Sequence, residues 1–90
     1  MKHPVAVRFG ENLSRVRDLT GLSQEDLGIK AGLHRTEISQ LERGLRVARI
    51  DTLVKLAGAL GVSTDDLLDG IAWEPARIQR GGFDLKKAED

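Results

Sequence analysis

The chain has 90 residues, which is the size of one small domain. Its net charge is zero, which argues against a general binder of polyanions. Its 40% hydrophobic and 31% charged residues are typical of a soluble globular protein and exclude a disordered chain. The absence of cysteine excludes disulfides and thiolate metal sites, and no apolar run approaches the ~20 residues of a membrane helix. Because nothing near Met1 resembles a signal peptide, we expect a cytoplasmic protein with no membrane contact.

The charges are sorted along the sequence. Residues 1–50 carry nine Lys/Arg and six Asp/Glu, whereas residues 51–90 carry five and eight. Between Lys30 and Arg49 there are five basic residues and two acidic ones. This distribution indicates one positive face on the folded domain, and the alternative is chance sorting of a few charges.

An amphipathic helix is predicted from about Val5 to Leu19. Its apolar residues recur at helical spacing, and Gly21 is typical of a helix end. Gly10 weakens the middle of this helix, because glycine has a poor helix propensity. The residues expected on the inner face are Phe9, Leu13, Val16 and Thr20.

A second, shorter helix is predicted from about Gln24 to Ala31. Ser23 before it and Asp26 three residues later approximate a capping box, in which side chains satisfy the free N–H groups of the first turn. Leu27 and Ala31 form its inner face. Gly32 ends it, and we expect this glycine to adopt a left-handed conformation.

Three more helices follow the same pattern. The third runs from about residue 35 to 43 with Ile38 and Leu41 inward, and the fifth runs from about residue 64 to 69 behind a Ser63 cap. The fourth runs from about residue 50 to 60. The residues of the fourth helix expected to face inward are Ile50, Leu53, Leu56, Ala57 and Leu60. The chain is therefore predicted to be all-α, with five short helices.

The second and third helices have the spacing of a helix-turn-helix. Counted from Gln24 as the first position, a small residue stands at position 5 (Gly28), glycine at 9 (Gly32) and aliphatic residues at 15 and 18 (Ile38 and Leu41). A small residue lets the two helices approach closely, and the glycine makes a tight turn. This arrangement directs the second helix of the pair outward, where it fits a major groove.

The segments "GLSQEDLGIKAGLHRTEISQLERG" and "TLVKLAGALGVSTDDLL" resemble the Xre family of lambda-repressor-like DNA-binding domains. The resemblance covers about Phe9 to Gly70, and its motifs occur together, in order and at the family's spacing. It implies a five-helix lambda-repressor-like fold for residues 1–70, with the helix-turn-helix at about residues 24–43. Residues 71–90 form a C-terminal extension outside the resemblance.

The resemblance also implies roles for single residues, which the sequence carries at matching positions. Gln24, at the start of the second helix, is expected to contact DNA phosphate, since a helix N-terminus attracts anions. Arginine can pair with guanine, glutamine with adenine and a threonine methyl with thymine. The expected base readers are Arg35, Thr36, Ser39 and Gln40, and the expected phosphate contacts are Gln24, His34, Arg43, Arg46 and Arg49.

Four features near these sites carry their own interpretation. Glu42 is expected to serve the fold, holding backbone or an arginine. Arg49 replaces a serine cap that many relatives have before the fourth helix, so either Asp51 supplies the acceptor or the helix start is loose. Glu37 should face away from phosphate. The aspartates near the fifth helix suggest capping and a solvated acidic face rather than a metal site: Asp65, Asp66 and Asp69.

In the C-terminal extension, Pro75 forbids an ordinary helix interior, and aromatic residues are rare in unstructured tails. We therefore expect short extended segments at Ile71–Trp73 and Phe83–Leu85. These segments would pack on their own domain or on a second subunit. Trp73 is interpreted as a packing residue rather than a ligand platform. Residues 86–90 are expected to fray.

Together, these features predict a homodimeric regulator that binds an inverted repeat in double-stranded DNA, associated with the nucleoid. The alternative is an antitoxin or a protein-interaction adaptor that uses the C-terminal tail to bind a partner protein. No paired catalytic histidines, tyrosine or cysteine support an enzyme. We expect no catalytic residue, no metal and no cofactor.

Overall fold

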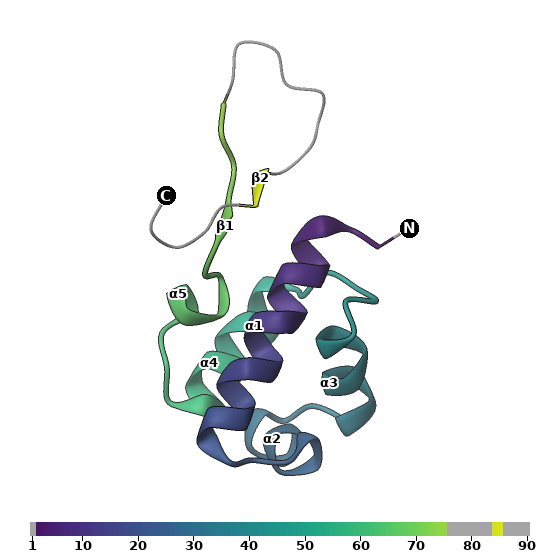
Figure 1. Ribbon diagram of the computed structural model, residues 1–90. Coiled ribbons are helices and arrows are strands. Elements are labelled where there is room, and N and C mark those ends of the chain that lie inside the picture. Colours follow the sequence, from purple (N-terminus) through teal and green to yellow (C-terminus); the bar gives the residue numbers. More distant parts are fainter. Residues whose placement is uncertain (1, 76–83, 86–90) are drawn as a thin grey trace.

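A computed structural model describes residues 2–75 and 84–85 of the protein, and all five predicted helices are present in it (Figure 1). Their bounds differ from the sequence prediction by at most two residues at any end. The helices are α1 (Pro4–Thr20), α2 (Gln24–Ala31), α3 (Arg35–Glu42), α4 (Ile50–Leu60) and α5 (Thr64–Leu67). Two short strands follow, β1 (Ile71–Ala72) and β2 (Asp84–Leu85).

Local signals set the helix ends, as predicted. Ser23 Oγ accepts a hydrogen bond from the Asp26 backbone N–H at 2.9 Å, which fixes the start of α2. Gly21 and Gly32 end α1 and α2 in the left-handed conformation, with φ of 77° and 69°. Helix α1 begins one residue before the prediction, at Pro4, because proline suits the first helical position and His3 Nδ1 accepts from the Val5 N–H.

The core lies between α1 and the other four helices. Figure 1 shows α1 crossing the domain, with α3 on one side of it, α4 and α5 on the other, and α2 closing the end where α1 terminates. Every helix contributes at least one buried aliphatic side chain to a single cluster. The largest fully buried members are Leu13, Leu27, Ile38, Leu41, Leu56 and Leu67. These residues hold the helices together by burial of apolar surface.

Two inward assignments from the sequence are wrong. Thr20 is exposed and its hydroxyl donates to the Arg17 carbonyl oxygen at 2.7 Å. Ile50 is 81% exposed, although its i, i+7 spacing places it only about 20° around the helix from the buried Ala57, so the described part of the chain leaves this side of the first turn uncovered. The buried position in the first turn of α4 belongs to Thr52.

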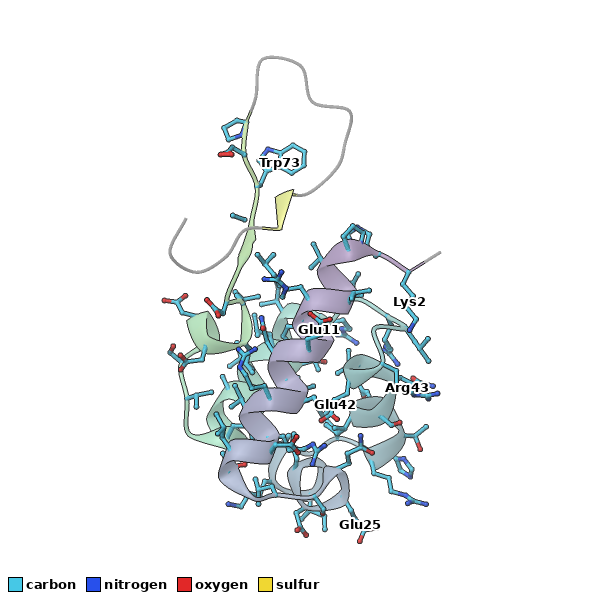
Figure 2. The ribbon with its side chains drawn as sticks, in the orientation of Figure 1. Lys2, Glu11, Glu25, Glu42, Arg43 and Trp73 are labelled. Atoms are coloured by element: carbon cyan, nitrogen blue, oxygen red, sulfur yellow. The ribbon has the colours of Figure 1, made fainter. Side chains whose placement is uncertain are left out.

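The extended segments are confirmed where the structure describes them. Strands β1 and β2 pair antiparallel, with Ile71 opposite Leu85, and both contact α1. Trp73 follows β1, stands away from the helices and is 46% exposed (Figure 2). Phe83 and the predicted frayed end at residues 86–90 lie outside the described residues. Within residues 2–75 and 84–85, no helix combines the length and apolar character needed to cross a membrane.

Candidate nucleic-acid interface

A tight turn joins α2 to α3. The Leu33 backbone N–H donates to the Gly28 carbonyl oxygen at 2.8 Å across this turn. A Cβ on Gly28 would stand 2.6 Å from the Leu33 carbonyl oxygen and 3.3 Å from the Arg35 nitrogen, so no side chain fits there. The close approach predicted at Gly28 is therefore confirmed, and its immediate partner is the turn itself.

Helix α3 is held against α1 by backbone contact as well as by its buried side chains, Ile38 and Leu41. A Cβ on Gly10, in the middle of α1, would overlap the Leu41 carbonyl oxygen and stand 2.7 Å from that of Glu42. The glycine that the sequence marked as a weak point is thus the place where α1 admits the end of α3. Gly44, just beyond α3, also lies close to α1, since its Cβ would stand 3.0 Å from Val7 Cα.

The first turn of α3 presents its side chains to solvent. Arg35 and Thr36 are exposed, and neither side chain is engaged by the fold through any hydrogen bond within the described part of the chain. His34 Nδ1 accepts from the Thr36 backbone N–H at 3.1 Å, so His34 caps α3. Ser39 and Gln40 are half-buried on the same helix. The structure therefore leaves Arg35 and Thr36 most available to a ligand in a groove.

The arginines after α3 are exposed and each makes one local contact. Arg43 Nε donates to the Ser39 carbonyl oxygen at 3.4 Å, and Arg46 Nη1 donates to Gln40 Oε1 at 3.3 Å. Arg49 Nε lies 3.2 Å from Asp51 Oδ1. No side chain caps α4, so Asp51 pairs with Arg49 instead of replacing the missing serine.

Lys2 also belongs to this basic region, which sequence reasoning missed. Its Nζ donates to the Arg43 carbonyl oxygen at 2.7 Å, at the C-terminal end of α3 (Figure 2). The negative end of the helix dipole also stabilises a cation at this position. The contact joins residues 41 apart in sequence, and no local pattern points to it.

Glu42 anchors the other side of α3. Arg17 Nε lies 2.6 Å from Glu42 Oε2 and Nη2 lies 3.1 Å from Oε1, and the two side chains are only 15% and 7% exposed. The hydrogen bond from Arg17 and its charge interaction with Glu42 raise the pKa of Arg17 above the ordinary arginine value. The interpretation of Glu42 as a residue that holds an arginine is confirmed.

Gln24 joins this pair. Its Nε2 donates to Glu42 Oε1 at 3.0 Å, and the Gln24 side chain is half-buried. Arg17 in turn donates from Nη1 to the Leu22 carbonyl oxygen at 2.8 Å, just before α2. One carboxylate therefore ties together α1, the start of α2 and the end of α3.

A family model for helix-turn-helix proteins matches residues 13–67, which include the α2–turn–α3 unit and most of the domain. The chain belongs to the Xre/Cro/C1-type helix-turn-helix family. This is a family of DNA-binding transcription regulators, not of enzymes.

Individual relatives of this helix-turn-helix domain support the assignment. The control protein C.BamHI of Bacillus amyloliquefaciens is 40% identical over 70 residues, covering 77% of this chain and 86% of its own length. The control protein C.SmaI of Serratia marcescens is 45% identical over 60 residues, covering 67% and 71%. The crystal structure of the restriction-modification controller C.AhdI from Aeromonas hydrophila has a TM-score of 0.67 and 39% identity, covering 69% and 94%. The lambda-repressor-like fold is thereby confirmed.

Two of the three aspartates near α5, Asp66 and Asp69, have structural partners. Asp66 Oδ2 accepts from the Ser63 backbone N–H at 3.1 Å, completing the predicted capping box of α5. Asp69 lies 3.9 Å from Arg15. In the described ranges, 2–75 and 84–85, no three His, Cys, Asp or Glu side chains gather as a metal site would require.

Proposed function

We propose that this protein is a sequence-specific regulator of transcription that inserts α3 into the major groove and binds an inverted repeat as a homodimer. The single observation that carries the proposal is the orientation of α3. Its exposed first turn offers Arg35 and Thr36, while its other end is held against α1 at Gly10 and Glu42. A helix held in this way presents base-reading side chains in a constant direction.

Base reading is assigned to Arg35, Thr36, Ser39 and Gln40. Arg35 can donate two hydrogen bonds to guanine. Gln40 can pair with adenine while its side-chain carbonyl oxygen accepts from Arg46. The half-buried positions of Ser39 and Gln40 limit them to bases that lie close to the helix. Arg35 is therefore expected to make the largest contribution to sequence discrimination.

Phosphate binding is assigned to Gln24, His34, Arg43, Arg46 and Arg49. The three arginines are exposed, and Lys2 adds a fourth cation at the end of α3. Phosphate contacts of this kind set the position of a protein on the duplex and carry no sequence information themselves. They are expected to supply the salt-dependent part of the affinity.

Dimerisation is supported by an apolar patch at the start of α4, which we call the α4 patch and define as Val47, Ile50 and Val54. All three side chains are at least half exposed. Val47 and Ile50 line an apolar groove together with Phe9 and Leu53. Exposed apolar surface of this kind marks an interaction site. We propose that the two-fold axis of the dimer lies near this patch and that the two copies of α3 share one face, as half-sites about 34 Å apart require.

The named relatives favour restriction-modification control as the biological setting. Two of them are control proteins and a third is a restriction-modification controller. On this proposal, the protein binds DNA next to the genes it regulates and acts at the nucleoid. A duplex carrying the region upstream of its own gene should compete for binding with the best selected sequence.

The test is a selection of bound duplexes from a random pool, followed by titration of the enriched sequence. We expect an inverted repeat, two protein chains per duplex, and log affinity falling linearly with log salt by about 0.9 per phosphate neutralised. No enrichment of any sequence, with no duplex bound in ~100 mM salt, would refute the proposed function.

A second candidate role is favoured by the exposed Trp73 beside the β1–β2 pair. Here residues 71–90 form an extension that binds a partner protein, as in an antitoxin or adaptor, whereas residues 1–70 bind DNA. Trp73→Ala in the full chain separates the roles. If the extension serves a partner protein, dimerisation and DNA affinity should be unchanged, and if it serves the dimer, both should fall.

A further inference from the structure

The hydrogen bond between Gln24 and Glu42 determines whether the NH2 group or the carbonyl oxygen of the Gln24 amide faces Glu42. Glu42 is paired with Arg17, and an ionised carboxylate only accepts hydrogen bonds. Gln24 must therefore turn its NH2 group, not its carbonyl oxygen, toward Glu42 Oε1, at 3.0 Å. The amide nitrogen has two hydrogens, and this bond uses one of them.

A DNA phosphate is also an acceptor. The Gln24 side chain can bind it only through an N–H, and the second hydrogen of the amide nitrogen is the one that remains. We infer that Glu42 is a positioning residue for DNA binding, which holds the Gln24 amide so that its second N–H faces the phosphate backbone. This inference rests on the proposed function, because it concerns how that function's phosphate contact is made.

The surroundings of Glu42 suit this role. Its side chain is 7% exposed and is held by Arg17 through both carboxylate oxygens. Arg17 is itself anchored to the Leu22 carbonyl oxygen, two residues before Gln24. The carboxylate therefore cannot swing toward solvent without breaking several hydrogen bonds, and its orientation is passed on to the amide of Gln24.

The inference predicts an effect opposite in sign to simple electrostatics. Removing a negative charge near DNA ordinarily strengthens binding, because repulsion with phosphate is lost. Glu42→Gln removes such a charge but introduces an NH2 group. When the oxygen of the new amide accepts from Arg17, the NH2 group of that amide faces Gln24. Gln24 must then turn its own carbonyl oxygen toward this NH2 group. The donor for the phosphate is thereby misdirected.

The experiment compares Glu42→Gln with Glu25→Gln, using the full chain and the duplex obtained by selection. Glu25 lies on α2 next to Gln24, is exposed, and its side chain has no hydrogen bond or ion pair in the described structure (Figure 2). We expect Glu25→Gln to bind as tightly as the wild type or more tightly. Glu42→Gln should bind every duplex roughly tenfold more weakly, as expected for loss of a hydrogen bond to a charged group.

A double-mutant cycle with Gln24→Ala separates positioning from simple loss of structure. If Glu42 acts through Gln24, the double variant should bind like Gln24→Ala alone. An independent structural effect would make the two losses multiply, to roughly a hundredfold. Multiplied losses, or tighter binding by Glu42→Gln, overturn the inference while leaving the proposed function intact.

The wild-type protein offers a second measurement that does not depend on the variants folding. In NMR spectra of the free protein, the side-chain amide proton of Gln24 that is bonded to Glu42 should exchange with solvent more slowly than the protons of a solvated glutamine amide. The other should move downfield when the selected duplex is added. If both Gln24 amide protons exchange as fast as those of a solvated glutamine in the absence of DNA, the inference is overturned directly. A wild type that binds no duplex refutes both the proposed function and the inference.

Discussion

Arg17 and Glu42 form a two-bond ion pair that joins α1 to the last residue of α3, with Nε to Oε2 at 2.6 Å and Nη2 to Oε1 at 3.1 Å. Parallel bonds of this kind are the strongest and most directional of the ion pairs between side chains. Because α3 carries the proposed base readers, this pair contributes both to stability and to the placement of the reading face.

Arg17→Met should lower the free energy of unfolding by about 2–4 kcal/mol, because it leaves the Glu42 carboxylate buried without its cation. Urea unfolding followed by circular dichroism measures this change. Arg15→Met is the matched control, because Arg15 lies on the same helix and makes only an exposed contact of 3.9 Å with Asp69. Its effect should stay within about 0.5 kcal/mol. Equal losses in the two variants would contradict the stabilising role of the Arg17–Glu42 pair.

Gly10→Ala should destabilise the domain by about 1–3 kcal/mol, although alanine is the better helix former. The added Cβ overlaps the Leu41 carbonyl oxygen, so α1 and α3 must separate. Gly58→Ala is the control, since Gly58 lies within α4 and its Cβ would meet nothing within 4 Å. Thermal unfolding should show Gly58→Ala gaining about 0.5–1 kcal/mol. A gain of similar size in Gly10→Ala would refute the close approach.

Arg35→Ala should cost about 1–3 kcal/mol of binding free energy on the selected duplex and relax the preference at one base pair. The reason is the loss of its hydrogen bonds to a base edge. Arg43→Ala should weaken binding evenly on all sequences and reduce the salt slope by about 1. Fluorescence anisotropy on single-substitution duplexes distinguishes the two. Equal losses on every duplex in both variants would overturn the assignment of Arg35 as a reader.

Ile50→Asp should shift the protein toward monomer at ~100 µM, measured by light scattering, because a charge in an apolar contact is costly to bury. Leu19→Asp is the control, since Leu19 and Ile50 are both 81% exposed and Leu19 lies at the end of α1, away from the α4 patch. The control should keep the oligomeric state of the wild type. A wild type that is monomeric both with and without the selected duplex would contradict the dimer.

The helices were predictable because their signals are local. The hydrogen bond from Asp26 to Ser23 and the left-handed glycines at residues 21, 32 and 61 involve positions within a few residues of each other. The apolar period likewise repeats within each helix. The assignment failed at Ile50, because a single apolar residue at a helix start does not reveal whether a partner covers it.

The sequence by itself determined the five helices, the helix-turn-helix spacing and the family, since these depend on caps, glycines and short-range periodicity. Only the tertiary structure decided the use of Gly10, the exposure of Ile50 and the bonds from Arg17 and Gln24 to Glu42, which span 25 and 18 residues. The physical reason is that these features depend on which surfaces meet when the helices pack. A residue's own neighbours in sequence carry no information about a contact that packing creates.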